Sequence, residues 1–349
     1  MSGPTLSTRQ LNRALLARQL LLERSELPLP RALEQVAGLQ TQYAPSAYVG
    51  LWSRLRDLRR DDLTGALQRG EALQGTLMRS TIHVVSARDY PLFAEGIRTG
   101  RRAWWRRVQQ HQVEGLDMEK VAALLRERLA AGPKRQAELL SLLEAEGIPR
   151  IAWSGVGLWV DMVRVPPSGT WEQRRADLYG LAADHLGAWE VSEAEGLEHL
   201  VRRYLGGFGP APLRDVAGWA GLPVTPFRPV LKRLELRRFR DQQDRELLDL
   251  PDAPLPDPER PAPARLLPTW DATLLVHARR TQILPERHRP RVFNTRTPHS
   301  VPTLLVDGQV AGTWRYQRGR VELQPFGRLP RAARRELDEE AERLAAFHA

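Results

Sequence analysis

The chain has 349 residues, 52 Lys and Arg against 42 Asp and Glu, a formal charge of +10 and no cysteine. This length predicts two to three domains or a tandem array, and the missing cysteines exclude disulfides, thiol nucleophiles and cysteine metal sites. No apolar run reaches the roughly 18 residues of a membrane helix and the first residues do not resemble a signal peptide, so we expect a cytoplasmic protein.

Arginine dominates the basic residues, since very few of the 52 are lysine. A guanidinium group binds phosphates and base edges through two hydrogen bonds at once, which favours a nucleic-acid partner. A GC-rich genome would enrich arginine, alanine, leucine and proline without any functional demand. Composition alone does not favour either explanation of the arginine excess, a nucleic-acid partner or a GC-rich genome.

Three segments share one plan, in which two or three helices are followed by an extended basic hairpin. They divide the chain into units of residues 1–95, 96–190 and 191–250. The predicted helices cover residues 9–23, 30–40, 61–70, 117–132, 132–147, 154–163, 193–206, 211–222 and 225–235. The extended or hairpin segments cover residues 73–86, 163–182 and 236–250.

Helices followed by a two-stranded wing are typical of the winged helix-turn-helix, and three copies account for the length. We therefore predict an α+β protein with three tandem winged helix-turn-helix units. An ordinary α+β protein with hairpins between its helices is the alternative.

The remainder of the chain differs in composition. Residues 251–268 are too rich in proline for regular structure and are interpreted as a stiff linker. Residues 269–349 are predicted to form a small β-rich unit, with strands over 273–284 and 301–326 and turns at Asp307-Gly308 and Arg318-Gly319. A charged amphipathic helix over 330–348 closes it.

Common catalytic and cofactor motifs are missing. The glycine-rich residues 206–212 follow a helix and lack the Gly-Lys-Ser/Thr ending of a phosphate loop. No His-x-x-x-His pair occurs, and Ser168-Gly169 lacks the preceding glycine of a nucleophile elbow. We therefore expect no cofactor and no metal, and a conventional hydrolase, kinase or dehydrogenase is excluded.

Three basic segments are candidates for DNA contact. Residues 98–111 combine five arginines with Trp104 and Trp105, which suits phosphate contact and stacking, or equally a helix that buries one tryptophan. In residues 277–292, basic side chains surround a proline-containing turn between predicted strands, a shape that could enter a groove. These side chains are Arg279, Arg280, Arg287, His288, Arg289 and Arg291.

The third segment lies in the first predicted hairpin. Alternation along a strand would place Arg79, Thr81 and His83 on one face, where they could contact DNA. A buried histidine with its hydrogen bonds satisfied is an equally ordinary interpretation of His83.

Two glutamines, Gln40 and Gln42, stand one residue apart at the end of the second predicted helix. In an α-helix their side chains would point about 200° apart, whereas in extended backbone they share a face. Pro45 disfavours the α conformation at Ala44, so we predict that the helix ends around Gln40. An irregular segment there could direct both amides at one point.

Several stretches together resemble the bacterial winged-helix DNA glycosylases of the AlkZ/YcaQ type. They are GLQTQYAPSAYVGLWSRL, TLMRSTIHVV, WSGVGLWVDMVRVPPSGTW and VDGQVAGTWR, and the resemblance runs from about residue 8 to 327. It implies three winged-helix units in a C-shaped scaffold around duplex DNA, and hence a nucleoid-associated protein. The oligomeric state stays open, and a monomer that encloses the duplex would fit this scaffold. The resemblance also implies monofunctional excision of alkylated purines and, in some members, unhooking of interstrand crosslinks.

The family's catalytic signature, Gln-x-Gln, falls on Gln40 and Gln42, which places the chain on the AlkZ side of the family. Its middle residue is Thr41, where an aliphatic residue is expected. Alkylation at N7 of guanine makes the base a cationic leaving group, so the enzyme needs only to position water and stabilise an oxocarbenium-like sugar. We assign Gln42 chiefly to the water and Gln40 to orientation and the sugar cation, two roles that could be exchanged.

We therefore expect a DNA glycosylase acting on cationic alkylated purines of the N7-alkylguanine type in double-stranded DNA, with crosslinks as further candidate substrates. Two other functions use the same scaffold. A non-catalytic DNA-binding regulator has no need of the glutamine pair, and a protein-interaction array would bind DNA weakly and without salt dependence.

Overall fold

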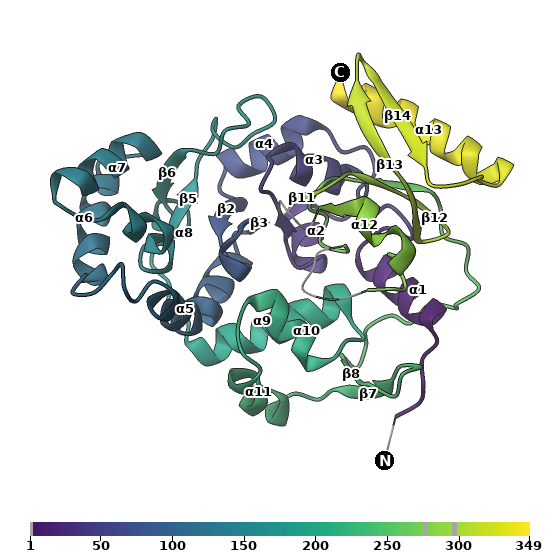
Figure 1. Cartoon of the computed structure of the whole chain (residues 1–349), viewed down its shortest axis with the longest axis horizontal. Coiled ribbons are helices and arrows are strands. Elements are labelled where there is room, and N and C mark those ends of the chain that lie inside the picture. Colours follow the sequence, from purple (N-terminus) through teal and green to yellow (C-terminus); the bar gives the residue numbers. More distant parts are fainter. Residues whose placement is uncertain (1–2, 275–277, 279, 295–298) are drawn as a thin grey trace.

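A six-stranded antiparallel sheet lies at the centre of the structure, a computed structural model that describes residues 3–274, 278, 280–294 and 299–349 (Figure 1). Its strand order is β1-β3-β2-β5-β6-β4. The strands are β1 (Leu39–Gln40), β2 (Ala72–Thr76), β3 (Ile82–Ser86), β4 (Lys134–Arg135), β5 (Met162–Arg164) and β6 (Leu178–Leu181). Because β2 pairs with β5, the hairpins of the first two predicted units form one continuous sheet.

The first unit contains four helices: α1 (Thr8–Arg18), α2 (Leu29–Gln35), α3 (Pro45–Trp52) and α4 (Arg60–Gln68). Of these, α2 packs against β3, α4 against β2 and α1 against the later helix α9 (Glu193–Phe208). Ser7 and Gln10 form a reciprocal capping box that fixes the start of α1. The predicted helix over 9–23 is too long, because α1 ends at Arg18 and Leu20 takes a left-handed φ of 56°.

The 20-residue helix α5 (Asp89–Val108) connects the first hairpin to α6 (Met118–Ala130) and α7 (Gln136–Ala145). It contains most of the basic segment 98–111 and buries Trp105, while Trp104 stays exposed. The helix predicted over 154–163 is wrong. Short 3-10 turns over 150–154 and 156–158 replace it, and β5 follows. Trp105 packs so close to Gly155, between the two turns, that a Cβ there would lie 2.4 Å from the ring.

The second unit ends with α8 (Ala183–Leu186). The third unit contains α9 (Glu193–Phe208), α10 (Leu213–Ala220), α11 (Arg228–Arg233) and the hairpin β7 (Arg237–Arg240) to β8 (Glu246–Asp249). Helix α9 crosses α5 at Gly96 and Gly196. A Cβ on Gly196 would lie 2.4 Å from the backbone nitrogen of Gly96, so only glycine permits this close approach.

The C-terminal part is a four-stranded antiparallel sheet, ordered β14-β13-β12-β9, that is covered by helix α13 (Arg331–His348). The strands are β9 (Arg265–Leu267), β12 (Thr303–Val306), β13 (Gln309–Gln317) and β14 (Arg320–Pro325). This confirms the α+β class, the β-rich C-terminal unit, its two turns and its closing helix. The end of the proline-rich segment is more than a linker, because β9 pairs with β12.

The strand predicted over 273–284 is wrong in the residues that the structure describes. Residues 272–274 form turns, and Arg280 is buried with its guanidinium bonded to the carbonyls of Ala272 and Thr273. The following residues form the short helix α12 (Arg289–Val292) and the two-residue strands β10 (Phe293–Asn294) and β11 (His299–Ser300).

Three buried ion pairs connect distant parts of the chain. Arg18 in α1 contacts Asp249 in β8 at 2.6 Å, and Arg54 after α3 contacts Asp271 at 2.9 Å. Arg24 contacts Glu340 in α13 at 2.6 Å. Among the described residues, no helix is long and apolar enough to cross a membrane.

Candidate functional site

Of the two glutamines, Gln40 lies in β1 at the edge of the central sheet, and Gln42 lies in a bend just after this strand. Helix α2 ends at Gln35, five residues before the predicted end, because Ala37 and Gly38 both take left-handed backbone angles with φ of 61° and 74°. Gln40 then pairs with His83 in β3. Ala44 is α-helical despite the proline that follows it, so the expected effect of Pro45 on Ala44 is wrong.

Gln40 is buried and held by an arginine. Its side chain is 6% exposed, and its Oε1 accepts a hydrogen bond of 2.8 Å from Nη2 of Arg79. The other terminal nitrogen of Arg79 donates to the carbonyl of Trp219, near the end of α10, at 2.6 Å. The carbonyls at a helix C-terminus carry partial negative charge, so this end of α10 suits a cation.

Gln42 is exposed, and its Oε1 accepts a hydrogen bond of 2.8 Å from the backbone N–H of Ile82. Both amide oxygens are thus held by the β2–β3 hairpin. Gln40 is held by Arg79 in the hairpin tip, the turn Met78–Ser80 between the strands, and Gln42 by Ile82, the first residue of β3. An amide oxygen has two lone pairs, so each glutamine retains one acceptor position. Between them Thr41 is buried, with its hydroxyl 3.5 Å from the carbonyls of Tyr43 and Ala44.

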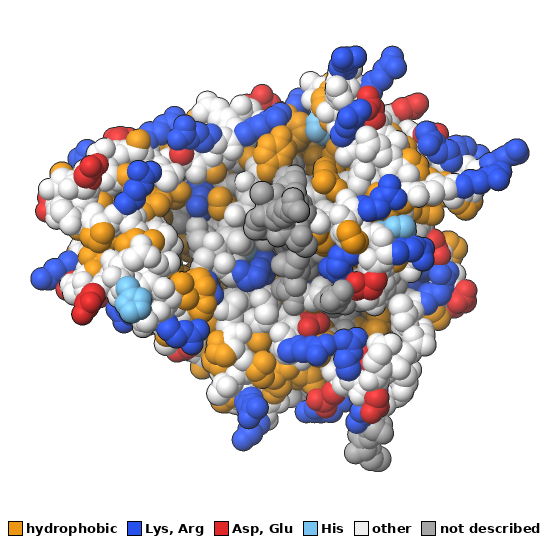
Figure 2. All heavy atoms as spheres, in the orientation of Figure 1, with side chains coloured by type: hydrophobic (Ala, Val, Ile, Leu, Met, Phe, Trp, Pro, Cys, Tyr) orange, Lys and Arg blue, Asp and Glu red, His pale blue; other side chains and the backbone are white. Residues whose placement is uncertain are grey.

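The hairpin tip is strongly cationic. Burial lowers the pKa of Arg79 to about 10, with Arg280 and Arg101 acting in the same direction and Tyr204 opposing them. Arg101 donates to Ser80 at 2.9 Å and to the carbonyl of Gly221 at 3.1 Å, and so also joins the tip to the end of α10. Figure 2 shows lysine and arginine side chains at the rim and in the middle of the face in view.

The strand face predicted for Arg79, Thr81 and His83 does not form, because Arg79 lies in a 3-10 turn between the strands with φ of 56°. His83 is buried, and its Nδ1 lies 3.0 Å from the carbonyl of Thr81. Burial lowers the pKa of His83 to about 3, with a contribution from Arg79. The Thr81 hydroxyl donates to the carbonyl of Met78 at 3.0 Å.

The basic residues between 279 and 291 do not form the predicted turn that would present their side chains together. Arg279 lies outside the described residues, and Arg280 is buried against Tyr204, whose hydroxyl lies 3.1 Å from its Nη2. The others lie in the short helical segments 286–292, where Arg287 and Arg291 are exposed and His288 and Arg289 are half-buried.

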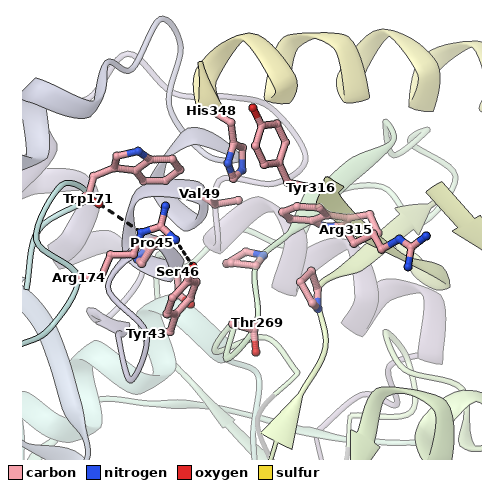
Figure 3. A pocket seen from close by; sticks show the side chains of 13 residues that line it. Tyr43, Pro45, Ser46, Val49, Trp171, Arg174, Thr269, Arg315, Tyr316 and His348 are labelled. Atoms are coloured by element: carbon pink, nitrogen blue, oxygen red, sulfur yellow. Dashed lines mark hydrogen bonds between the residues drawn. The ribbon is translucent and has the colours of Figure 1, made fainter. Parts of the chain in front are cut away.

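A pocket beside the glutamines was not anticipated from the sequence. It has a volume of about 310 Å³, and Tyr43, the residue after Gln42, lines it together with Trp171, Trp314, Tyr316 and His348 (Figure 3). Arg174 lies at Tyr43, with Nη1 2.8 Å from the phenol oxygen. These residues come from four separated parts of the chain, so no local pattern indicated them.

Comparisons with known proteins agree with this architecture. A family model described as DNA glycosylase AlkZ-like matches residues 33–347. Among solved structures, Streptomyces sahachiroi DNA glycosylase AlkZ is similar to this chain with a TM-score of 0.79 and 18% sequence identity, over 99% of this chain and 97% of that chain. A comparison with curated proteins gave no match. Because the family model spans most of the chain, the glutamine pair included, the chain belongs to the AlkZ-like DNA glycosylase family.

Proposed function

We propose that the chain is a monofunctional DNA glycosylase that hydrolyses the N-glycosidic bond of cationic alkylated purines, of the N7-alkylguanine type, in duplex DNA. Interstrand crosslinks of the same chemistry are further candidate substrates. One observation carries the proposal: Gln40 ends the edge strand β1, Gln42 lies in the bend just beyond it, and the same hairpin holds both amide oxygens.

The two glutamines differ in ways that suit different roles. Gln42 is exposed and keeps an acceptor position, so it can accept a hydrogen bond from the attacking water. Gln40 is buried beside the charge of Arg79, which disfavours a sugar cation there. We therefore assign Gln42 to the water and the developing sugar cation, and Gln40 to orientation.

The chemistry needs little more than this. A base alkylated at N7 already carries positive charge and leaves without protonation, so a strong general acid is unnecessary. An oriented amide dipole can stabilise the oxocarbenium-like transition state and fix the water in line with the bond that breaks. The same reasoning predicts low activity on neutral lesions.

The scaffold supports a DNA substrate. We propose that the helices with their hairpins β2–β3, β5–β6 and β7–β8 are three tandem winged-helix units, arranged in a C-shape around the duplex. Exposed arginines such as Arg287 and Arg291 are proposed phosphate contacts, with His288 and Arg289 beside them. DNA affinity should then fall steeply with salt, because each phosphate contact releases counterions.

The decisive experiment compares release of 7-methylguanine from methylated duplex DNA by the wild type and by Gln42→Ala. We expect the substitution to lower the single-turnover rate roughly 10²–10³-fold, as the loss of one oriented electrostatic group does in other enzymes. DNA affinity, measured in parallel, should stay within about threefold of the wild type, since Gln42 is uncharged.

A non-catalytic DNA-binding regulator is the rival function, because winged helices commonly bind DNA without chemistry. It predicts salt-dependent binding with no base release from methylated or crosslinked duplex by the wild type. That result would mean that the glutamine pair has no catalytic role.

A further inference from the structure

The loop between β5 and β6 brings an arginine to the residue that follows Gln42. Nη1 of Arg174 donates a hydrogen bond of 2.8 Å to the phenol oxygen of Tyr43, and its Nε donates to the carbonyl of Trp171 at 3.4 Å. Figure 3 shows the guanidinium between these two rings, whose centroids both lie 5.8 Å from its Cζ. Tyr43 and Arg174 are both exposed, so this contact is open to solvent one residue away from Gln42.

The loop that carries Arg174 is fixed at two places. At its base, the hydroxyl of Ser168 accepts a hydrogen bond of 2.8 Å from the backbone N–H of Asp177. Further along, Trp171 is 5% exposed and packs edge-on against Tyr48 in α3, the helix that follows the glutamines, with ring centroids 5.7 Å apart. A side chain on a loop held in this way can be placed accurately relative to the site.

The charge of Arg174 is not compensated by the protein. Among the described residues, no carboxylate lies within ion-pair distance of its guanidinium. Two neighbouring arginines differ in this respect: Arg175, the next residue of the loop, pairs with Asp177 at 2.8 Å, and Arg315, which also lines the pocket, pairs with Glu322 at 2.6 Å. An exposed cation without a carboxylate partner suits an anionic ligand.

Two hydrogen-bond donors meet at this point. Nη2 of Arg174 makes no hydrogen bond to any residue that the structure describes, so its N–H groups are available. The hydroxyl of Tyr43 accepts a bond from Arg174 and still has its own proton to donate. Phosphate oxygens accept from arginine and from tyrosine hydroxyls in protein–DNA complexes, and such contacts position the duplex without reading its sequence.

We propose that Arg174 and Tyr43 together bind one backbone phosphate next to the damaged nucleotide and so hold its sugar at Gln42. Consecutive Cα atoms are about 3.8 Å apart, so a strand bound by the side chain of Tyr43 passes close to the amide of Gln42. The contact is to the backbone, so the base need not leave the duplex, and the same phosphate should be bound beside a methylated and beside a crosslinked purine. This inference rests on the proposed function.

The first test uses duplexes in which a single phosphate near the lesion is replaced by a neutral methylphosphonate, one position at a time. The lesion is a 2′-fluorinated 7-methylguanine nucleotide, whose fluorine stabilises the glycosidic bond, so binding is measured without excision. We expect one linkage at which neutralisation weakens binding by the wild type about three- to tenfold, while Arg174→Ala shows no loss there. Tyr43→Phe, which keeps the ring, should show a reduced loss at the same linkage. If Arg174→Ala responds to every linkage as the wild type does, the proposal is wrong.

Arg175→Ala is the matched control. It removes the same formal charge from the same loop, but the side chain of Arg175 is 85% exposed and already pairs with Asp177. Arg175→Ala should therefore keep the wild-type response to the sensitive linkage. The plot of log K against log salt concentration should be shallower by about 0.9 for Arg174→Ala, as for one lost phosphate contact, and close to the wild type for Arg175→Ala. Equal slopes for the two variants would contradict a direct contact.

The second test separates this inference from the proposed function. Wild-type release of 7-methylguanine that Arg174→Ala slows about three- to tenfold at saturating enzyme supports both, since a misplaced sugar lowers the rate of the bound complex. Release that Arg174→Ala does not slow at saturating enzyme overturns the role in holding the sugar and leaves the glycosylase standing. The expected response to one linkage in binding, without any release by the wild type, supports the phosphate contact and contradicts the glycosylase.

Discussion

The guanidinium of Arg79 and the amide of Gln40 meet directly, with Nη2 2.8 Å from Oε1. Arg79 belongs to the turn between β2 and β3, and its second nitrogen is fixed by the carbonyl of Trp219. The orientation of Gln40 is therefore set by the first hairpin and by α10, two parts of the chain that are 140 residues apart.

Arg79 is thus a positioning residue, and Arg79→Leu should lower the single-turnover excision rate by about 10–100-fold, since a misplaced group costs up to about 10²-fold. The Michaelis constant and the affinity for undamaged duplex should change less than about threefold, because the side chain is mostly buried. Arg79→Lys should restore part of the rate, since lysine keeps the charge but lacks the planar fork. A parallel loss of DNA affinity would contradict a positioning role.

His83 should make stability depend on pH. Its pKa is about 3 in the folded chain and about 6.5 when unfolded, so the unfolded chain binds the proton more readily. The contribution is fully present above about pH 6.5 and is lost as pH falls towards about 3, with a slope of up to about 1.4 kcal/mol per pH unit. Urea unfolding between about pH 4 and 6 should give a free energy of unfolding that depends less on pH for His83→Gln than for the wild type. Above about pH 7 the two slopes should agree, which provides the internal control.

Removing one partner of the ion pair of Arg54 with Asp271 should be strongly destabilising. Both side chains are fully buried, and Nη1 and Nη2 lie 2.9 and 3.0 Å from the two carboxylate oxygens. Arg54→Met should lower the free energy of unfolding by about 3–5 kcal/mol, because it leaves Asp271 buried and unpaired. Denaturant unfolding measures this loss.

The double variant Arg54→Met/Asp271→Leu should recover most of that loss, since no charge is then left unpaired. Arg56→Ala is the control, because Arg56 and its partner Glu26 are exposed, and its removal should cost at most about 1 kcal/mol. The prediction would be contradicted if Arg54→Met lowered the free energy of unfolding no more than Arg56→Ala does.

The crossing of α5 and α9 depends on glycine at Gly196. Gly196→Ala places a Cβ 2.4 Å from the nitrogen of Gly96, so it should destabilise the fold by about 1–3 kcal/mol through overpacking. Gly206 lies in the same helix, and a Cβ there would be 3.7 Å from Leu250, an ordinary contact. Gly206→Ala should therefore be neutral or stabilising by up to about 1 kcal/mol. Equal melting temperatures for the two variants would contradict the close crossing.

Local chemistry in the sequence determined much of the secondary structure. The turns at Asp307-Gly308 and Arg318-Gly319 take left-handed angles, with φ between 44° and 78°, and the glycine at the second position of each turn favours this backbone. The hairpin β7–β8 and the closing helix also lie where the pattern of the chain predicts them. Each of these features depends on residues within a few positions of one another, so a single sequence contains the information.

The errors arise where a distant contact overrides the local preference. Ala37 has no intrinsic preference for a left-handed backbone, yet it takes one two residues after the end of α2. The next residue, Gly38, packs against β3, where a Cβ would lie 2.7 Å from the side chain of Val85. The apolar residues 154–163 could form a helix by pattern, but the ring of Trp105 occupies the space beside Gly155. Arg280 could face DNA by composition, but it is buried against Tyr204.

For the candidate site, the sequence by itself determined that Gln40 and Gln42 stand two positions apart next to a glycine and a proline, and hence that extended backbone could align them. Only the tertiary structure decided that Arg79 holds Gln40, that β3 holds Gln42, and that an aromatic pocket lies beside them. Those contacts join α3, α10, β13 and α13, and their geometry depends on the packing of elements far apart in the chain. Sequence spacing fixes directions along one element, whereas packing between elements fixes which side chains meet.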